Sequence, residues 1–418
     1  MQEKDGEVKG MSDIDATGVP RAARASVETV LAAVWDDETF TSNDVMPRVG
    51  LTRSTTIEAI DELIRYGVVE ELPNARVGGD YRKGRPARRF AFRPDAASVV
   101  GVDAGRTHVI ATVADLRGRP LTRVSRELTT DLDDPVRRQD VVAAVIDAAL
   151  ADAGIAREHV VAVCVGVPAP VDADGRSPAR HNDFWYRMNP DLADTAAPWA
   201  PLVRVENDAS LAAVAESVHG AAVGCRNFVA ILAGDRLGSG VVIDGHLLRG
   251  AHGGAGELIP FDHVRGVGSV DGIGVHVATW ARQAAEQGRI GSRSRLAGLS
   301  PSELTAPAVF AAAREGDPDA VDIIVRSARV ITRIASVFGG FFDPERIIFC
   351  GAVAESIESA LVPARTMIQN EMHLPAPDLV ASPLGADVVA AGAVAAATES
   401  ARTHLLAFAS TPLTAPSR

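Results

Sequence analysis

The sequence predicts an α/β protein in which a small helical module precedes a larger body made of two related halves. Its 418 residues, 47% of them hydrophobic, are enough to bury a full core and indicate two or three domains. Apolar residues recur at helical spacing near the N-terminus, and a strand, glycine turn and strand plan then occurs twice. We expect a disordered leader over residues 1–20, the module over 21–98, the body over 99–400 and a tail over 401–418.

The composition indicates in which cellular compartment the protein is expected. The chain starts with polar and charged residues and no apolar segment behind them, so we expect no signal peptide. No run reaches the roughly 18 apolar residues of a membrane helix. Cys164, Cys225 and Cys350 each lie in an apolar run, which predicts buried thiols rather than disulfides. We therefore expect a reducing cytoplasm.

Three helical segments are expected in the N-terminal module. The buried stripe of the first helix consists of Val27, Val30, Leu31, Val34 and Trp35. Ser42 can cap the second helix, and Gly50 suits its end. Pro47 fits that helix only in its first turn, because it lacks a backbone donor. Thr52 can cap the third helix, and Gly67 ends it.

The second and third helices, joined by a short turn that contains glycine, are typical of a helix-turn-helix. Ile57, Ile60 and Ile64 are expected to face inward on the third helix, with Leu63 beside them. The N-terminal end of this helix is expected to expose short polar side chains and one arginine, which suit phosphates and base edges. These candidate DNA contacts are Thr52, Arg53, Ser54, Thr55 and Thr56.

A basic loop follows the helices, between two expected strands at residues 68–72 and 89–92. From residue 76 to residue 93 the acidic residue is Asp80, and the basic residues are Arg76, Arg82, Lys83, Arg85, Arg88, Arg89 and Arg93. Such a wing suits a DNA backbone, with Arg82, Lys83 and Arg85 as candidate contacts. Because the net charge is -12, DNA contact requires a local basic patch of this kind. The alternative is a small protein-interaction domain with a solvated basic loop.

The body is expected to contain a duplicated strand plan. Residues 98–103 form a buried strand, Gly105 a turn, and residues 109–113 a returning strand. The same plan recurs over residues 228–248. Two copies that each lead into helical segments predict two halves with a cleft between them, where ligands usually bind.

Two polar turns in this body predict a phosphate and sugar site. One is the run Asp103 to Thr107, and the other is Glu206 to Ala209; each follows an apolar strand. The alternative for Asn207 and Asp208 is a strand-end turn, or a cap for a helix over residues 209–216.

An ordered set of motifs then resembles the ROK family, named for repressors, open reading frames and kinases. The landmarks are Gly84-Arg85-Pro86, Asp103 to Thr107, Gly166-Val167-Pro168, Glu206 to Ala209, Arg249 to Glu257 and Ile347 to Ala352. The resemblance covers about residues 21–400. It implies an α/β fold with an N-terminal winged helix-turn-helix and a duplicated actin-like, ribonuclease H-like ATPase body. It also implies a dimer and, in the regulator branch, DNA binding.

The resemblance implies roles for individual residues. In the sugar kinases of the family an aspartate acts as base on the sugar hydroxyl, which here corresponds to Asp208. Asn207 and Glu257 correspond to sugar ligands, and His252 and Asn182 are secondary candidates for the same pocket. The residues that correspond to the nucleotide-phosphate site are Asp103, Gly105, Thr107, Gly238, Gly240 and Gly351.

Two departures from the kinase pattern bear on catalysis. Asp235 and Arg236 replace the hydroxyl and glycine of the second phosphate loop, and a carboxylate about 4 Å from a phosphate charge costs about 4 kcal/mol at an effective dielectric near 20. Arg236 offsets part of that cost. The cysteine cluster that binds structural zinc in many members is missing from residues 266–273, and His263 and His276 do not replace it, so we predict no metal.

These observations predict a sugar-responsive DNA-binding regulator, a repressor, whose degenerate kinase-like body needs no cofactor. The expected partners are double-stranded operator DNA, a sugar or sugar derivative, and a second copy, as a homodimer or a dimer of dimers. Residues 321–337 are assigned either to that interface or to the core. The alternative is an ATP-dependent sugar kinase that uses ATP and Mg²⁺, with Asp208 as general base.

Overall fold

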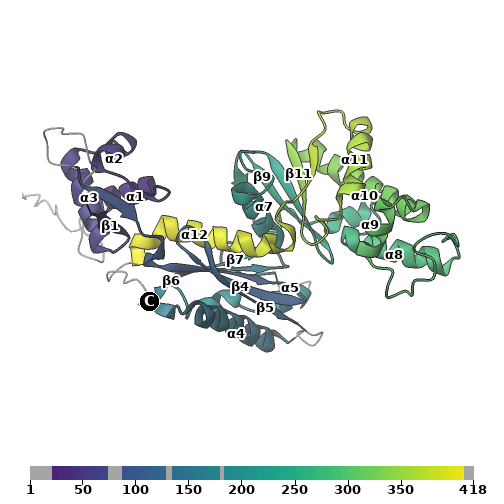
Figure 1. The fold of residues 1–418 in the computed structure, drawn as a ribbon, viewed down its shortest axis with the longest axis horizontal. Helices are drawn as coiled ribbons and strands as arrows, with labels where there is room; N and C mark the ends of the chain where they lie inside the picture. Colours follow the sequence, from purple (N-terminus) through teal and green to yellow (C-terminus); the bar gives the residue numbers. More distant parts are fainter. Residues whose placement is uncertain (1–20, 74–86, 129–133, 179–182, 409–418) are drawn as a thin grey trace, which may run out of the picture.

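The computed structural model describes residues 21–73, 87–128, 134–178 and 183–408. A small head lies at one end of the long axis, and two lobes of a larger body follow it (Figure 1). Asn182 and the wing residues Arg82, Lys83 and Arg85 lie outside the described residues, as do the expected leader and the last ten residues.

The head contains three helices and a two-stranded sheet. Its elements are α1 (Arg21–Val34), α2 (Ser42–Val49), α3 (Arg53–Arg65), β1 (Val69–Leu72) and β2 (Arg89–Phe92). The two strands pair antiparallel. The apolar stripe expected on α1 is fully buried, and it packs with the inner faces of α3 and the strands. The elements expected from residues 21 to 93 are thus confirmed.

The cap of α2 differs from the expectation. Thr41, not Ser42, occupies the N-cap, and the Asp44 carboxylate accepts hydrogen bonds from the Thr41 backbone N (2.9 Å) and hydroxyl (2.8 Å). Pro47 lies inside the helix and not in its first turn. Pro47 removes one hydrogen bond from this helix of two turns, which ends soon after it at Gly50, in a left-handed conformation at φ 66°.

The predicted cap of α3 is confirmed, but the predicted face is rotated. The Thr55 backbone N donates to the Thr52 hydroxyl at 3.3 Å. Thr56 is fully buried, and its hydroxyl donates to the Thr52 carbonyl at 2.9 Å. The buried face comprises Thr56, Ala59, Ile60 and Leu63, whereas Ile57 and Ile64 are half-buried. The expectation that Thr56 is exposed for DNA contact was therefore wrong, because its hydroxyl bonds back to its own helix.

The body contains two five-stranded sheets with the same topology. The first has the order β5-β4-β3-β6-β7 and the second the order β10-β9-β8-β11-β12. In each, the central strand pairs antiparallel with the next strand along the chain and parallel with a later strand. The first sheet contains β3 (Ser98–Ala104), β4 (His108–Asp115), β5 (Pro120–Glu127), β6 (Val160–Val167) and β7 (Leu202–Asn207). The second contains β8 (Phe228–Ala233), β9 (Leu237–Ile243), β10 (His246–Leu247), β11 (Arg346–Cys350) and β12 (Asp378–Ala381). The predicted duplication is confirmed.

Helices cover both sheets and separate them. On one face of the first sheet lies α4 (Pro135–Ala153), with the short α5 (Asp183–Met188) and α6 (Leu192–Ala196) beside it. Between the sheets lie α7 (Asp208–His219), which packs on β8 and β9, and α12 (Val388–Phe408), which packs on β3 and β6 (Figure 1). Beyond the second sheet lie α8 (Ile273–Glu286), α9 (Ala306–Arg314), α10 (Pro318–Phe342) and α11 (Glu358–Glu371). Because α12 continues to Phe408, the tail does not begin at residue 401 as expected.

Glycines let the central helices approach their neighbours closely. A Cβ atom on Gly392 of α12 would lie 2.0 Å from the Leu211 carbonyl oxygen on α7. A Cβ on Gly101 of β3 would lie 2.4 Å from the backbone N of Val394. No side chain fits either contact, so α12 is packed backbone to backbone against the helix and the strand that lead to the candidate site.

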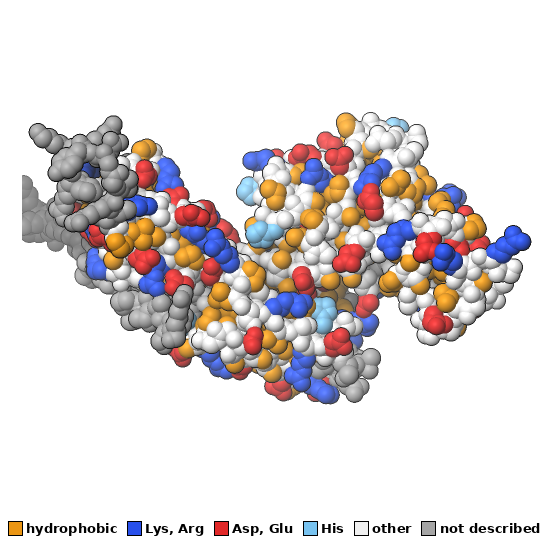
Figure 2. Space-filling view, viewed as in Figure 1, with side chains coloured by type: hydrophobic (Ala, Val, Ile, Leu, Met, Phe, Trp, Pro, Cys, Tyr) orange, Lys and Arg blue, Asp and Glu red, His pale blue; other side chains and the backbone are white. Residues whose placement is uncertain are grey.

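Other expectations on burial were met in part. Cys164 and Cys350 are buried, but Cys225 is half-buried; all three thiols are free. Most apolar residues of the stretch 321–337 belong to the core of the second lobe, on α10. Within the described residues, no helix has the length and apolar character needed to span a bilayer. Acidic and basic side chains alternate over the face of the body that Figure 2 shows.

Candidate functional site

Three predicted carboxylates come together between the lobes. Asp208 is the first residue of α7, Asp103 lies near the end of β3, and Glu257 follows the glycine-rich run. Burial raises the pKa of Asp208 to about 7, and the charges of Asp103 and Glu257 raise it further. The Asp208 carboxylate accepts a hydrogen bond from the Ala209 backbone N at 2.7 Å, which opposes this rise. A carboxyl group with this pKa exchanges its proton near neutral pH.

Asn207 occupies the N-cap of α7, which is the alternative expected from the sequence. Its Oδ1 accepts a hydrogen bond from the Ser210 backbone N at 3.0 Å, and its Nδ2 donates to the Ala169 carbonyl at 3.2 Å. The cap fixes the direction of α7 and so places Asp208 beside Gly238 of the second lobe. The amide oxygen keeps one lone pair for a ligand.

The glycine-rich run from Arg249 to Glu257 passes between the two lobes. A Cβ atom on Gly253 would lie 1.9 Å from the Val171 carbonyl oxygen of the first lobe. A Cβ on Gly256 would lie 2.1 Å from the Ser239 carbonyl oxygen of the second. These positions require glycine, since both also have a positive φ, of 72° and 91°. Burial raises the pKa of Glu257, and Arg236 lowers it. His252 is exposed on the same run.

Asp103 already has a protein partner. Its Oδ2 lies 3.0 Å from Nε2 of His108, and this hydrogen bond raises the pKa of the histidine. A Cβ atom on Gly105 would lie 2.8 Å from the imidazole carbon Cε1, so glycine is needed for the histidine to fold back over the turn. Thr107 is exposed in that turn. The predicted phosphate residues Asp103, Gly105 and Thr107 are therefore together, around a histidine that the sequence did not identify.

A buried arginine that the sequence did not identify holds the same turn. Arg138 of α4 is 1% exposed and donates to the carbonyls of Ala104 and Gly105, and to that of Met188 at 2.9 Å. Burial lowers its pKa to about 10, while the Asp103 charge opposes the change. The sequence does place a charged residue on the apolar face of an amphipathic helix. Such a residue is costly to bury unless it is paired, and this was the signal that could have identified it.

The two turns predicted to bind phosphate are joined by an ion pair. Arg106, after β3, lies with Nε 3.0 Å and Nη2 2.9 Å from Oδ2 of Asp235, which follows β8. The pair bridges the first lobe to the second, and both side chains are more than half exposed. Asp235 was expected to disfavour phosphate, and its partner in the structure is an arginine on the opposite turn.

The remaining predicted glycines lie around the end of β8. Gly238 and Gly240 belong to β9, which begins at Leu237, so the expected loop from residue 234 to 240 is shorter than predicted. A Cβ atom on Gly238 would lie 4.0 Å from Oδ1 of Asp208, and one on Gly240 would lie 2.5 Å from the Ala209 carbonyl oxygen. Gly351, at φ 88°, follows β11, and a Cβ there would lie 3.3 Å from the Ala233 carbonyl oxygen.

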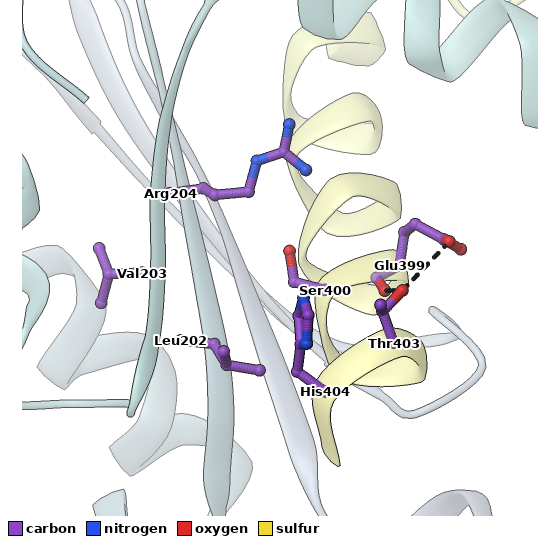
Figure 3. A pocket seen from close by; sticks show the side chains of 7 residues that line it. All are labelled: Leu202, Val203, Arg204, Glu399, Ser400, Thr403 and His404. Carbon is purple, nitrogen blue, oxygen red and sulfur yellow. Dashed lines mark hydrogen bonds between the residues drawn. The ribbon is translucent and has the colours of Figure 1, made fainter. Parts of the chain in front are cut away.

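A separate pocket of about 240 Å³ lies between β7 and the last turns of α12 (Figure 3). Arg204 borders it from β7, while its guanidinium also binds the buried Glu206 carboxylate, which Arg249 contacts at 3.0 Å. The lining residues are Leu202, Val203, Arg204, Glu399, Ser400, Thr403 and His404. None of the residues predicted to bind sugar or phosphate lines it.

In the head, the predicted DNA contacts gather at the start of α3. Arg53 and Ser54 are exposed, and the Thr52 hydroxyl lies 2.9 Å from that of Thr55. Arg88 has internal partners instead: it binds Asp61 at 2.9 Å and Glu71 at 2.8 Å. The described part of the wing thus supports the head, and the candidate contacts Arg82, Lys83 and Arg85 stay predictions.

The predicted absence of zinc also stays a prediction. His276 Nε2 lies 3.1 Å from the Ser269 carbonyl, and its ring stacks on Trp280 at 5.0 Å. Among the described residues, no group of three or more histidine, cysteine or acidic side chains is arranged to hold a metal ion.

Comparison with known proteins finds both regulators and kinases. A glucokinase of Streptomyces coelicolor is 28% identical over 306 residues, which cover 68% of this chain and 93% of the glucokinase. The DNA-binding transcriptional repressor Mlc of Escherichia coli is 23% identical over 342 residues, which cover 78% of this chain and 80% of Mlc. The xylose repressor of Bacillus subtilis is 25% identical over 209 residues, about half of each chain.

Solved structures show the same two kinds of protein. A ROK family transcriptional regulator described as a homolog of the E. coli MLC protein superposes with a TM-score of 0.72 at 22% identity, covering 93% of this chain and 98% of the other. A ROK family glucokinase from Streptomyces griseus, in complex with glucose and AMPPNP, superposes with a TM-score of 0.59 at 28% identity, covering 72% of this chain and all of the other. The sequence model described as the ROK family matches residues 99–400, which are most of the chain. The protein therefore belongs to the ROK family.

Proposed function

We propose that the protein is a DNA-binding transcriptional regulator, a repressor, that responds to a sugar or a sugar derivative. The observation that carries the proposal is the head. The fold of the ROK regulator covers 93% of this chain, head and body, whereas the ROK glucokinase covers 72%. The body of this chain has kinase relatives, and the chain carries a helical head in addition. This domain composition is that of a ligand-responsive regulator.

The geometry of the head suits a winged helix-turn-helix. The helices α2 and α3 are joined by a short turn at Gly50, and α3 starts with exposed polar groups and Arg53. In this motif the second helix enters the major groove with its N-terminal residues on base edges. We assign Arg53, Ser54 and Thr55 to contacts with double-stranded operator DNA, with Thr52 as the cap that orients them. Two such heads in a homodimer or a dimer of dimers would read a palindrome.

The sugar site is assigned to the cleft around Asp208, with Asn207 and Glu257 as ligands. A carboxyl group of pKa about 7 accepts a hydrogen bond from a sugar hydroxyl when charged and donates one when protonated. Asn207 provides an amide oxygen whose position is fixed by the cap. Glu257 is the last residue of the glycine-rich run that passes between the lobes. His252 and Asn182 are further candidates for the same pocket.

The residues at the nucleotide-phosphate position do not fit a phosphate chain. The Asp235 carboxylate stands at the second phosphate turn and is bound to Arg106 across the cleft. Asp103, the acidic residue of the first turn, is bound to His108. A phosphate group there would meet a carboxylate and displace an ion pair that already joins the lobes. We therefore propose a body that binds sugar without phosphorylating it, and no cofactor.

A sugar kinase is the second candidate. The glucokinase relatives and the raised pKa of Asp208 favour it, because a general base works best with a pKa near the operating pH. In that case Asp208 would take the proton of the sugar hydroxyl, and ATP and Mg²⁺ would be required.

One experiment separates the two candidates. The purified protein is mixed with D-glucose, D-xylose or N-acetylmannosamine, and both its melting temperature and its ATP consumption are recorded. We expect one sugar to raise the melting temperature, since a ligand at 100 times its Kd adds about 2.7 kcal/mol, with no ATP turnover. Sugar-dependent turnover that is lost in Asp208→Asn would establish the kinase instead.

A further inference from the structure

The C-terminal end of α1 is held by two arginines of the body. Helix carbonyls in the last turn have no partner within their own helix, and that end of a helix carries partial negative charge. Arg117, in the turn between β4 and β5, donates from Nε to the Trp35 carbonyl at 3.2 Å and from Nη2 to the Asp37 carbonyl. Its guanidinium also lies 5.5 Å from the centre of the Phe92 ring.

The second arginine comes from the last turns of α12. Arg402 Nη2 lies 3.0 Å from Oδ2 of Asp36 and 3.4 Å from the Ala32 carbonyl oxygen. We call Arg117 and Arg402, with the end of α1 that they bind, the arginine latch. Both cations thus lie at the negative end of one helix, and each belongs to a segment of the body that is distant in sequence.

The turn that carries Arg117 is itself fixed. Asp115 Oδ1 accepts hydrogen bonds from the backbone N of Arg117 (2.8 Å) and of Arg119 (3.0 Å). Leu116 is fully buried, and its backbone N donates to the Pro94 carbonyl at 3.0 Å. Arg117 therefore gives the head a rigid pivot on the first lobe.

Arg402 lies instead on a helix that contacts both sides of the candidate sugar site. Gly392 of α12 touches the backbone of α7, whose first residue is Asp208, and Val394 touches Gly101 on the strand that carries Asp103. At these contacts the backbones are packed with no space between them, so a shift of α7 or β3 moves α12 as well. At its other end, α12 faces the open pocket that Ser400, Thr403 and His404 line (Figure 3). The turn that bears Arg402 therefore has space to move toward β7.

We propose that Arg402 is a positioning residue which transmits the state of the cleft to the head, while Arg117 holds the pivot. Closure of the lobes around a sugar moves α12, changes the contact of Arg402 with Asp36, and so reorients α3 relative to DNA. The sugar has this effect only if the latched and released arrangements bind it with different affinity. The inference rests on the proposed function for the sugar and DNA steps, but the latch itself is testable without either.

A charge exchange tests the pair. Arg402→Glu and Asp36→Arg each place like charges together, whereas the double variant restores opposite charges in reversed order. We expect each single variant to increase hydrogen exchange of the α1 backbone amides by about tenfold, and the double variant to recover at least part of the protection. Arg295→Glu, which breaks the exposed pair with Glu315 in the second lobe, is the matched control and should leave α1 unchanged.

The same variants test the transmission step. The DNA probe is a duplex that the wild-type protein selects from a random-sequence library, and the ligand probes are D-glucose and D-xylose. We expect the ratio of the DNA Kd with and without sugar to approach one in both single variants and to recover in the double variant. Sugar binding measured without DNA should persist in both single variants, because no latch residue lies at the cleft. Its Kd should shift toward that of the released arrangement, because the two arrangements differ in sugar affinity.

The outcomes are distinguishable. The latch is overturned if the α1 amides of both single variants exchange at the wild-type rate, or if the double variant recovers no protection. A wild-type protein that binds no sugar or no duplex overturns the proposed function, while the exchange result still decides the latch. A latch confirmed by exchange, with an unchanged sugar effect on DNA binding, overturns the transmission role of Arg402. Arg402→Gln, which removes the charge without reversing it, replaces Arg402→Glu if the latter does not fold.

Discussion

At the scale of single residues, the environment gives two identical side chains different properties. Burial, together with the charges of Asp103 and Glu257, raises the pKa of Asp208 to about 7. Asp103, near the end of β3, forms a hydrogen-bonded pair with His108. One carboxyl group thus has a raised pKa and a single backbone donor, while the other is paired with a histidine side chain.

The raised pKa of Asp208 predicts a pH dependence of stability. The folded state holds this proton more tightly than the unfolded chain, so the free energy of unfolding falls between about pH 4 and pH 7 and then levels off. Asp208→Asn cannot lose a proton, and we expect it to gain at least about 1 kcal/mol relative to wild type at pH 8. That gain, a rise of roughly 2–4 °C in Tm, should vanish at pH 4 in differential scanning calorimetry. An equal difference at both pH values would contradict the assignment.

Arg53 predicts a loss of DNA affinity without a loss of stability. Its side chain is exposed at the start of α3, so Arg53→Ala should leave Tm within about 1 °C. If it contacts a phosphate or a base edge, the free energy of duplex binding should weaken by about 1–3 kcal/mol. Fluorescence anisotropy would show this as a higher Kd. Arg314→Ala, an exposed arginine on α9, is the control and should bind DNA as wild type does. Equal affinity in the two variants would place the DNA interface elsewhere.

The residues of the site were predictable where one short segment determines them. Asn207 and Asp208 end an apolar strand and begin a helix, so the sequence predicts the cap at Asn207 that the structure shows. Arg138 and Arg106 were missed because their partners are distant in the sequence, and His108 was missed although its partner Asp103 is five residues earlier, across the turn. The Arg106 and Asp235 pair joins positions 129 residues apart, and no local pattern links the two.

At the scale of secondary-structure elements, backbone contacts at α12 are the least tolerant feature of the body. Gly392→Ala would place a Cβ atom 2.0 Å from the Leu211 carbonyl oxygen, so α7 and α12 must separate. We expect a loss of about 1–3 kcal/mol or more in urea unfolding. Gly340→Ala, in an open position of α10, should instead be neutral or gain up to about 1 kcal/mol. A stable Gly392→Ala protein would mean that the two helices are loosely packed.

Element boundaries were less predictable than the elements themselves. Thr41 and Ser42 are both good caps, and the choice between them depends on Asp44 reaching back to Thr41. The run from Gly234 to Gly240 suggested a long loop, yet β9 begins at Leu237, because its glycines pack against α7. Side-chain spacing predicts which segments are apolar, but tertiary packing decides where a strand begins.

At the scale of the whole molecule, the ion pair between Arg106 and Asp235 joins the two lobes at the turns predicted to bind phosphate. Asp235→Thr removes the carboxylate and releases Arg106, so a phosphate group could approach both turns. We expect AMPPNP, titrated with Mg²⁺ in a calorimeter, to bind at least about tenfold more tightly than to wild type. Asp322→Asn, an exposed acid on α10, should not change the affinity. Tight AMPPNP binding to the wild-type protein would contradict the proposed loss of the nucleotide site.

The overall architecture was predictable because the same order of strand, turn and returning strand occurs in both halves of the body. A strand, a turn and a returning strand appear at residues 98–113 and again at 228–243, and both sheets have the same strand order. The position of α12 was not predictable, since nothing in its alanine-rich sequence indicates that it crosses from the second lobe to the first. Its partners, β3 and α7, lie far earlier in the chain.

This crossing has a consequence for how the protein is made. The head emerges from the ribosome before the body, and Arg402, one of the two groups that seat it, is translated 370 residues after Ala32, whose carbonyl it contacts. The buried apolar residues of the head belong to one cluster with residues of the first sheet and of α12, so the head completes its packing only after α12 has been made. A nascent or truncated polypeptide that lacks α12 would therefore present a head without the contacts that Arg402 makes to Asp36 and Ala32.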